Sequence, residues 1–303
     1  MKILITGSNG LLGQKLIYAL SDRTDISLIA CARGENRITK KKGYLYESCD
    51  LSDELTVTAI VKKHQPDCII HTAAMTNVDA CELDPISCRK YNVDAVEYLV
   101  NACKEFKTHF INISTDFVFD GTSGPYSEED AANPLSVYAQ SKMDGEKIVM
   151  ESGLPWTTLR TMIIYGVTDD KQRSNIVLWT KKSLEEGQFI NVINDQFRGP
   201  TLAEDLADAC IVAATKKIKG LFHVSGKEVI SILEIAERVA DFFDLDKKFI
   251  QPITTASLKQ PAARPLKTGF IISKAERELN FHPRSLEEGL GIISEQLLKR
   301  QEA

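Results

Sequence analysis

The opening stretch of this 303-residue chain constrains its fold more than any other, because a short apolar run leads directly into three glycines. Residues 2–5 are predicted to form a strand buried on both faces, and residues 11–20 carry apolar side chains at helical spacing. The polar and glycine residues where strand and helix meet are Gly7, Ser8, Asn9, Gly10 and Gly13. A strand, a glycine-rich turn and a helix in this order are typical of sites that hold a dinucleotide pyrophosphate at a helix N-terminus.

The glycines of this stretch each have a predicted role. Gly7 permits the sharp turn, Gly10 lets a pyrophosphate approach the backbone because it has no Cβ, and Gly13 lets the helix pack close to the strand. Asn9 is predicted to contact the cofactor from the turn. The spacing, however, is Gly-x-x-Gly-x-x-Gly and not the dinucleotide fingerprint Gly-x-Gly-x-x-Gly, so the glycines alone are also compatible with a simple strand ending.

Composition excludes several classes of protein. The chain is 43% hydrophobic and 26% charged with a net charge of −5, which is ordinary for a soluble globular protein and argues against a nucleic-acid or membrane-surface partner. Its seven cysteines form no Cys-x-x-Cys pair, so we expect reduced thiols and neither a disulfide scaffold nor a zinc site. Residue 1 leads straight into the first strand and no apolar run is long enough to span a membrane, so we expect a cytoplasmic protein without a signal peptide.

The first half of the chain alternates strands with helices, which predicts a parallel sheet with helices on both faces. Further strands are predicted at residues 26–31, 44–47, 68–71, 110–113 and 156–159, and further helices at 55–63, 84–103 and 134–150. In the second half, the predicted elements are helices at 176–185 and 202–214 and a strand at 221–224. Three capping boxes are each predicted to open a helix: Ser231…Glu234, Ser273…Glu276 and Ser285…Glu288.

The predicted fold is therefore α/β, a Rossmann-type doubly wound parallel sheet with its ligand crevice at the carboxyl ends of the strands. A smaller α/β C-terminal substrate lobe is expected beside it. We expect residues 1–160 to form an NADP-binding Rossmann domain, to which the chain returns at about 201–225. Residues 161–200 and 226–303 are predicted to form the substrate-binding lobe, packed directly on the first because no flexible linker separates them.

The end of the second strand indicates the type of nicotinamide cofactor. Sites that prefer NAD(H) place an acidic residue there to hold the ribose hydroxyls, whereas this strand ends at Arg33. Arg33 either pairs with the 2′-phosphate of NADP(H), which we favour over NAD(H), or is a solvated surface residue.

Two further strand ends are predicted to reach the cofactor. Asp50 and Leu51 follow the third strand and either flank the adenine, or Asp50 or Ser52 serves only as the N-cap of the next helix. Ala73 and Ala74 follow the fourth strand, and their small side chains let the backbone pass close to the ribose and pyrophosphate.

Thr115, Tyr138 and Lys142 form the predicted catalytic group. Tyr138 and Lys142 are four residues apart, so on a helix their side chains point the same way. The ordinary pKa of tyrosine, about 10, is too high for efficient proton transfer near neutrality, and the Lys142 ammonium is expected to lower it. Tyr138 is then predicted to donate a proton to a ketone oxygen. Lys142 would also hold the nicotinamide ribose, and Thr115 would hydrogen-bond the substrate carbonyl.

With these residues assembled, the chain resembles the extended short-chain dehydrogenase/reductases, and within them the dTDP-4-dehydrorhamnose reductase family. The resemblance covers nearly the whole chain and rests on residues 7–13, 73–79, 114–121, 138–142, 160–166, 193–201 and 264–265. It implies an NADPH-dependent oxidoreductase of dTDP-rhamnose and cell-surface polysaccharide biosynthesis. The reaction implied is reduction of the 4-keto group of a nucleotide-linked deoxysugar, with dTDP-4-dehydrorhamnose giving dTDP-L-rhamnose.

The resemblance also implies site residues. It implies Thr115, Tyr138 and Lys142 as the catalytic triad. Around the cofactor it places Gly10, Leu11, Leu12, Asp50, Leu51, Ala74, Met75 and Thr76. The predicted substrate-binding residues are Val78, Thr115, Asp116, Ile163 and Arg198. Some members of the family bind Mg²⁺ at a dimer interface; no acidic cluster here requires a metal, so Mg²⁺ and a homodimer stay open and no metal ligand is predicted.

Two departures from the family pattern and two alternative functions stand beside this interpretation. Ile163 occupies the place of a family tryptophan, so an aromatic platform for the sugar nucleotide is missing, and the added Arg198 either meets a diphosphate or is only surface charge.

A sugar-nucleotide epimerase is one alternative function. Dehydration is disfavoured, because dehydratases carry Glu where this chain has Phe117. The other is a non-catalytic NADP-binding regulatory subunit, as the methionine adenosyltransferase β subunit is.

Overall fold

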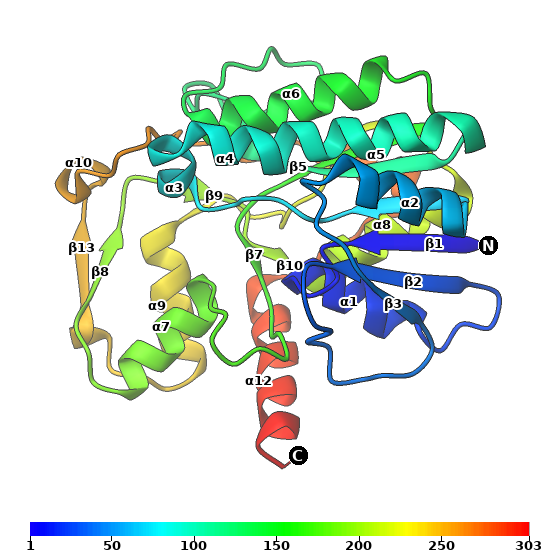
Figure 1. Ribbon diagram of the computed structural model, residues 1–303. Helices are drawn as coiled ribbons and strands as arrows, with labels where there is room; N and C mark the ends of the chain where they lie inside the picture. The colour runs from blue at the N-terminus through cyan, green and yellow to red at the C-terminus, as the bar shows by residue number, and fades with distance from the viewer. Residues whose placement is uncertain (303) are drawn as a thin grey trace.

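A seven-stranded sheet lies at the centre of the molecule in the computed structural model, which describes residues 1–302 (Figure 1). Its strands are all parallel and lie in the order β11-β6-β5-β4-β1-β2-β3. Their bounds are β1 Lys2–Thr6, β2 Ser27–Ala32, β3 Leu45–Ser48, β4 Cys68–His71, β5 His109–Thr115, β6 Trp156–Thr161 and β11 Gly220–His223. The strand order reverses between β1 and β4, and such a switch point opens a crevice at the carboxyl ends of the strands.

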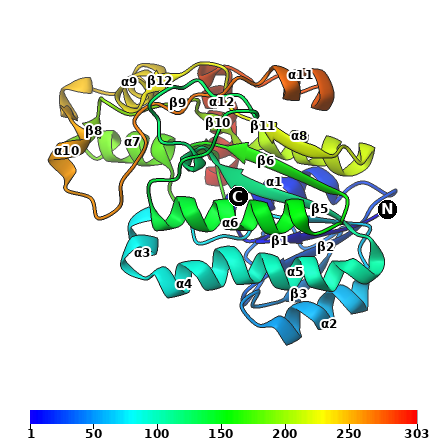
Figure 2. The ribbon, with the colours of Figure 1, turned by 90° about the horizontal axis from the view of Figure 1, so that it is seen from above.

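Helices cover both faces of this sheet, as the view from above shows (Figure 2). On one face lie α2 (Glu54–His64), α4 (Pro85–Arg89), α5 (Ala95–Cys103) and α6 (Val137–Glu151). On the other lie α1 (Leu11–Leu20), α8 (Ala203–Lys216) and α11 (Ser273–Leu279). The short α3 (Val78–Leu83) precedes α4, and a π-helical turn at Lys90–Asp94 joins α4 to α5. Short 3₁₀ turns lie at Lys104–Phe106, Asp116–Val118 and Lys247–Phe249.

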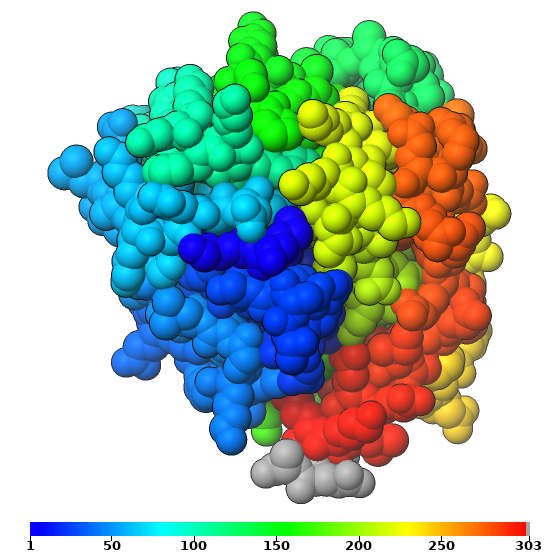
Figure 3. All heavy atoms as spheres, turned by 90° about the vertical axis from the view of Figure 1, so that its right-hand side faces the viewer, coloured from blue at the N-terminus to red at the C-terminus, as the bar shows by residue number. Residues whose placement is uncertain are grey.

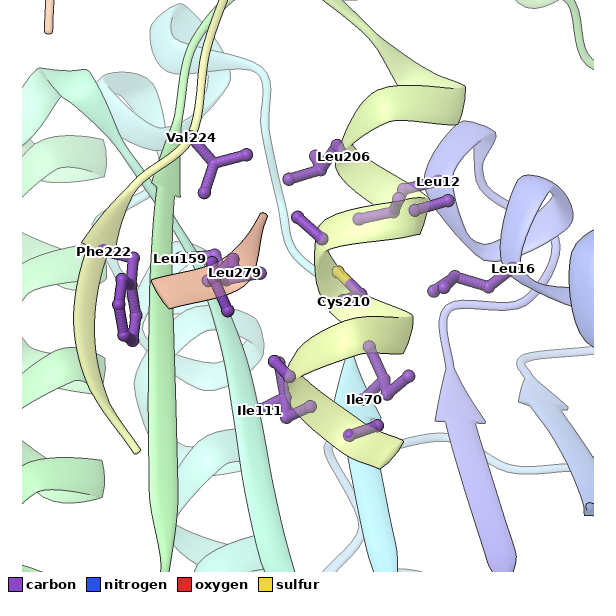
Figure 4. Packing of buried hydrophobic residues seen from close by; sticks show 14 of the residues in the cluster. Leu12, Leu16, Ile70, Ile111, Leu159, Leu206, Cys210, Phe222, Val224 and Leu279 are labelled. Carbon is purple, nitrogen blue, oxygen red and sulfur yellow. The ribbon is translucent and has the colours of Figure 1, made fainter. Parts of the chain in front are cut away.

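The strand residues alternate between two apolar layers, which is why the strands read as continuous apolar runs. Leu4, Ile69 and Phe110 pack toward α2 and α5. Ile70 and Ile111 pack toward α1 and α8, where Leu16, Leu206 and Cys210 meet them (Figure 4). Both layers are almost fully shielded from solvent, so the predicted Rossmann-type fold is confirmed.

The rest of the chain forms a smaller body beside the sheet (Figure 1). Its strands pair as β7 (Ile164–Tyr165) with β10 (Thr201–Leu202), β9 (Phe197–Arg198) with β12 (Ile230–Ser231), and β8 (Ile190–Ile193) with β13 (Ile250–Ile253). Its helices are α7 (Ile176–Glu185), α9 (Ile232–Phe242), α10 (Thr255–Leu258) and α12 (Leu286–Glu302). An apolar cluster containing Tyr165, Ile235 and Leu290 holds α9 and α12 together.

The chain returns to the main sheet after leaving it, because α8 packs against α1 and β11 pairs with β6. Figure 3 shows the side of the molecule where this happens. There the yellow surface of the α8–β11 region lies between the blue N-terminal segments and the orange C-terminal ones. A boundary between two lobes at residues 160, 201 and 225 stays a prediction.

Most element predictions agree with the structure to within three residues, with two informative differences. Ser231 caps α9, and Ser285 and Glu288 form the expected reciprocal pair, but Ser273 is not a cap because α11 already begins at that residue. The helix predicted at 84–103 is interrupted by the π-helical turn.

Two expectations from composition concern the cysteines and a membrane-spanning helix. All seven cysteines are buried in the core and carry free thiols. Among residues 1–302, no helix combines the length and the apolar character that a membrane crossing needs.

Candidate active site

A cleft of about 910 Å³ opens at the carboxyl ends of the strands, where the order reverses between β1 and β4. Its walls come from the segments that follow β1, β2, β3, β4, β5 and β6, and from the first turns of α6. The cleft brings together every predicted site residue except Gly13. Those that line it are Gly7, Asn9, Gly10, Leu11, Leu12, Arg33, Asp50, Leu51, Ala73, Ala74, Met75, Thr76, Val78, Thr115, Asp116, Tyr138, Lys142, Ile163 and Arg198.

The glycine turn forms one end of the cleft. Gly7 has φ +69°, and a Cβ there would lie 2.7 Å from the Ala73 nitrogen, so the turn needs glycine both for its conformation and for its close approach to the segment after β4. A Cβ at Gly13 would lie 2.4 Å from the Gly7 oxygen, so only glycine lets the helix pack this close to the turn. Gly13 does not line the cleft.

Helix α1 begins at this turn with an unneutralised positive end. Gly10 is its N-cap and offers no capping side chain, and the first turn contains no acidic residue. The first backbone N–H groups of α1 therefore face the cleft without an anionic partner from the helix itself. This arrangement fits a dinucleotide pyrophosphate.

Arg33 is exposed at the mouth of the cleft. Its guanidinium donates a hydrogen bond to the Tyr91 hydroxyl at 3.1 Å and lies over the Tyr91 ring, 5.8 Å from its centre. Asn9 shapes the neighbouring loop, because its amide donates to the Glu35 carbonyl and accepts from the Arg37 backbone N–H. Sequence reasoning did not find Arg37 and Tyr91, which also line the cleft.

Asp50 closes a turn of its own at the cleft wall. Its carboxylate accepts hydrogen bonds from the Ser52 N–H and hydroxyl at 3.0 and 2.7 Å, and these bonds lower the pKa of Asp50. The N-cap of α2 is Asp53, whose side chain accepts from the Leu55 N–H. The alternative in which Asp50 or Ser52 caps the helix is therefore wrong.

Asn92 is a structural residue of the site that sequence reasoning missed. Buried in the π-helical turn, it accepts from the Met75 N–H at 2.8 Å and donates to the Met75 carbonyl and the Ser141 hydroxyl. It thereby ties the segment after β4 to α6. The signal was present: Asn92 is a polar residue at helical spacing between apolar Cys88 and Val96.

Tyr138 and Lys142 lie in the first turns of α6. This helix begins later than the predicted residue 134, because the Ser136 hydroxyl caps it by accepting from the Ala139 N–H. Both side chains are buried and line the cleft one helical turn apart. Tyr138 lies beside Thr115, which stands at the end of β5 and lines the same cleft. The three predicted catalytic residues thus meet at one place.

The pKa values of this group correct one expectation. Burial raises the pKa of Tyr138 well above its ordinary value, and the nearby Thr115 hydroxyl only partly opposes this, so the prediction of a lowered pKa is wrong. Burial also lowers the pKa of Lys142 to about 8, with Glu146 opposing. At neutral pH the phenol therefore keeps its proton and is available as a donor.

Arg198 is buried and forms an ion pair with Asp116, with 3.0 Å between Nε and Oδ2. Its other nitrogens donate to the carbonyls of residues 197, 265 and 266. The surface-charge alternative for Arg198 is therefore wrong. Asp116 also accepts from Thr115 at 3.2 Å and from Thr268 at 2.5 Å, so a network of fixed hydrogen bonds reaches Thr115.

A second ion pair borders the cleft opposite the glycine turn. Arg264 donates to both carboxylate oxygens of Asp79 at 3.0 and 2.8 Å, which fixes the loop before residue 268 against α3. Gln196 and Ile232 complete this wall. Gln196 and Arg264 belong to segments that carry the family resemblance, but no individual role is predicted for them from the sequence.

Ile163 stands in the wall where the family tryptophan was expected. Its φ of +37° is unusual for a β-branched residue. The aromatic residues that line the cleft in the described chain are Tyr91, Phe117 and Tyr138. Phe117 packs edge-on against Tyr138 with ring centres 5.8 Å apart, so this ring supports the Tyr138 side chain.

The geometry agrees with the comparison to known families. The family model described as RmlD substrate binding domain matches residues 1–298. The chain belongs to this family. The resemblance to the extended short-chain dehydrogenase/reductases that the sequence motifs indicated is confirmed, and the family and its solved neighbours support an oxidoreductase that uses a nicotinamide cofactor.

Individual relatives of this RmlD-family chain differ in kind. A dTDP-4-dehydrorhamnose reductase of Clostridium acetobutylicum superposes with a TM-score of 0.86 at 28% identity, covering 98% of this chain and 100% of that one. The Bacillus anthracis dTDP-4-dehydrorhamnose reductase in complex with NADP has a TM-score of 0.84 at 27% identity, covering 97% and 99%. Methionine adenosyltransferase 2 subunit beta of Bos taurus is 34% identical over 280 residues, covering 91% of this chain and 81% of that one.

Proposed function

We propose that this protein is an NADPH-dependent reductase of the 4-keto group of a nucleotide-linked deoxysugar, with dTDP-4-dehydrorhamnose as its substrate. One observation carries the proposal: a single cleft contains the uncapped end of α1 and a buried, protonated Tyr138 between Thr115 and Lys142. The family match and the reductases among the solved relatives support the choice of substrate.

Each residue of this group has a separate role in the proposed reaction. The bound dinucleotide supplies the hydride. Tyr138 gives its proton to the carbonyl oxygen as that oxygen gains negative charge, which is the task of a general acid. Lys142 holds the ribose and, as a cation, stabilises the phenolate that remains. The buried position of Tyr138 and Lys142 strengthens these interactions because water does not screen them.

We also propose a division of the chain along the cleft. Residues 1–160 and 201–225 would bind the dinucleotide, and residues 161–200 and 226–303 would bind the sugar nucleotide. Ile163, Arg198, Ile232 and Arg264 support this, because the second set of segments contributes all of them to the cleft.

Mixing the purified protein with NADPH and enzymatically generated dTDP-4-keto-6-deoxysugar tests the function, with absorbance of the reduced nicotinamide as the readout. We expect oxidation of NADPH and formation of the 4-hydroxy sugar nucleotide in equal amounts. Conversion of the sugar without net loss of NADPH would instead identify an epimerase.

A second candidate is a cofactor-binding subunit of another enzyme. The 34% identity to a protein named as a methionine adenosyltransferase subunit favours it, as does the missing aromatic platform at Ile163. Tight NADPH binding without turnover of any keto-sugar, together with co-purification with a methionine adenosyltransferase catalytic chain, would support this candidate over the reductase.

A further inference from the structure

The arginines that line the cleft fall into two groups. Arg198 and Arg264 are each bound to a carboxylate by short contacts, at 3.0 and 2.8 Å. Arg33 lies against Tyr91 at the mouth of the cleft, and Arg173 lies beside the glycine turn and shares the partner Asp170 with Arg37. The closest carboxylate contacts of Arg37 and Arg173 are both with Asp170, at 3.5 and 3.8 Å, which is beyond hydrogen-bond distance.

Arg173 lies directly over the glycine turn. It belongs to the loop between β7 and α7, far along the chain, yet its Nη1 atom lies 3.9 Å from the position that a Cβ on Gly10 would occupy. Gly10 is the N-cap of α1, so the guanidinium and the positive end of the helix face the same small space.

The carboxylate nearest to Arg173 is that of Asp170, which does not line the cleft. The acidic residues that line the cleft are Asp50 and Asp116, and both are engaged, by Ser52 and by Arg198 respectively. Two positive groups brought this close favour an anion between them, and an anion with two bridged phosphates has the length to contact both.

Asp170 is placed to act as a temporary partner of Arg173. Its carboxylate is held by the Gln172 N–H at 3.0 Å, and its neighbour Asp169 fixes the loop by accepting from Tyr18 and from the Thr39 N–H. The side chain of Arg173 is about half exposed, at 47%, and so is free to change partners.

We propose that Arg173 binds the pyrophosphate of the dinucleotide on the side opposite to α1, leaving Asp170 as it does so. This rests on the proposed function, since it takes the dinucleotide as the ligand of the cleft. A residue from the segment assigned to the sugar nucleotide would thus complete the cofactor site.

Calorimetric titration of the whole protein with NADPH and with NADH tests the proposal. It measures the affinity for each cofactor and needs no measurement of turnover. The pyrophosphate is common to both cofactors, so Arg173→Gln is expected to weaken both by the same factor, about tenfold. Asp170→Asn keeps the acceptor oxygen for Gln172 but removes the charge, and is expected to strengthen both about threefold. Lys171→Gln, an exposed charge change in the same loop, serves as the matched control and is expected to change neither.

The outcomes separate this proposal from the function it rests on. Equal weakening in Arg173→Gln with unchanged binding in Lys171→Gln supports it. Wild-type affinity in Arg173→Gln overturns it and leaves the reductase proposal intact, and weakening of NADPH alone overturns it by moving the contact to the 2′-phosphate. Failure of the wild-type protein to bind either cofactor overturns the proposed function and this inference with it.

Discussion

The two ends of the cleft hold their charged groups in opposite ways. At the inner end, Arg198 and Asp116 are buried, and every polar contact of the pair is short and comes from the protein. At the outer end, Arg33 and Arg37 are exposed and have only a tyrosine hydroxyl and a distant carboxylate as partners. The charged groups of the inner end are therefore already paired within the protein. Those of the outer end are only weakly paired and can bind an anionic ligand.

This difference agrees with the task that the proposed function gives to each end. Proton transfer needs groups held in one geometry and shielded from water, because screening weakens the electrostatic stabilisation of developing charge. Capture of an anion from water needs cations that can exchange their partners at little cost, which exposed side chains do. The following predictions test whether the inner end supplies chemistry and stability while the outer end supplies only affinity.

The largest effect is expected at Tyr138. Tyr138→Phe removes the proton donor but keeps the ring against Phe117, so turnover of the keto-sugar is expected to fall about 1000-fold. NADPH affinity, measured by calorimetry, should stay close to that of the wild type. A variant that keeps most of its rate would show that Tyr138 is not the donor.

The next largest effect concerns the buried ion pair. Arg198→Met leaves the Asp116 carboxylate buried without its partner, which is expected to lower the free energy of unfolding by about 3 kcal/mol in a urea titration. The double variant Arg198→Met/Asp116→Asn is the control and should recover part of the loss. A loss below about 1 kcal/mol in the single variant would mean that the pair does not hold this end together.

Arg33 provides a smaller effect, on affinity alone. Arg33→Ala is expected to weaken NADPH about tenfold more than NADH, because only NADPH carries the 2′-phosphate. The unfolding free energy should barely change, since the side chain is exposed. Equal weakening of the two cofactors would remove the 2′-phosphate role.

The last prediction is a change of stability with pH. The pKa of Lys142 is about 8 in the folded protein and about 10.4 when the chain is unfolded, so between these values the unfolded chain binds more protons. The wild type should therefore gain stability relative to Lys142→Met as the pH rises from 8 to 10. Lys147→Met, at an exposed position of the same helix, is the control and should show no such trend. A parallel response of wild type and Lys142→Met would contradict the burial of the ammonium.

The two ends of the cleft also differ in how far the sequence predicted them. Local patterns place the glycine turn, the strand ends and the Tyr138–Lys142 pair, because strand ends of a parallel sheet meet at one edge and spacing on a helix fixes direction. The burial of Arg198 depends on Asp116 and on carbonyls near residue 265, which are distant in sequence, and no local pattern reports them.

The wrong expectation for the Tyr138 pKa has the same origin. Spacing brings an ammonium near the phenol, but the packing of the whole fold decides how much water either group loses, and here desolvation raises the pKa of Tyr138. Arg173 could not be found at all from the sequence, since a loop beyond β7 carries no pattern that places it over the first turn of the chain.

The bonds from Thr268 and from the residue-265 carbonyl to the Asp116–Arg198 pair have a consequence for how the protein is made. A chain still being translated has its glycine turn and its Tyr138–Lys142 pair long before it has residues 265–268. Until those residues emerge, Asp116 lacks Thr268, and Arg198 lacks the carbonyls of residues 265 and 266. The nascent protein would acquire the means to hold a dinucleotide before it acquires a finished place for the reaction.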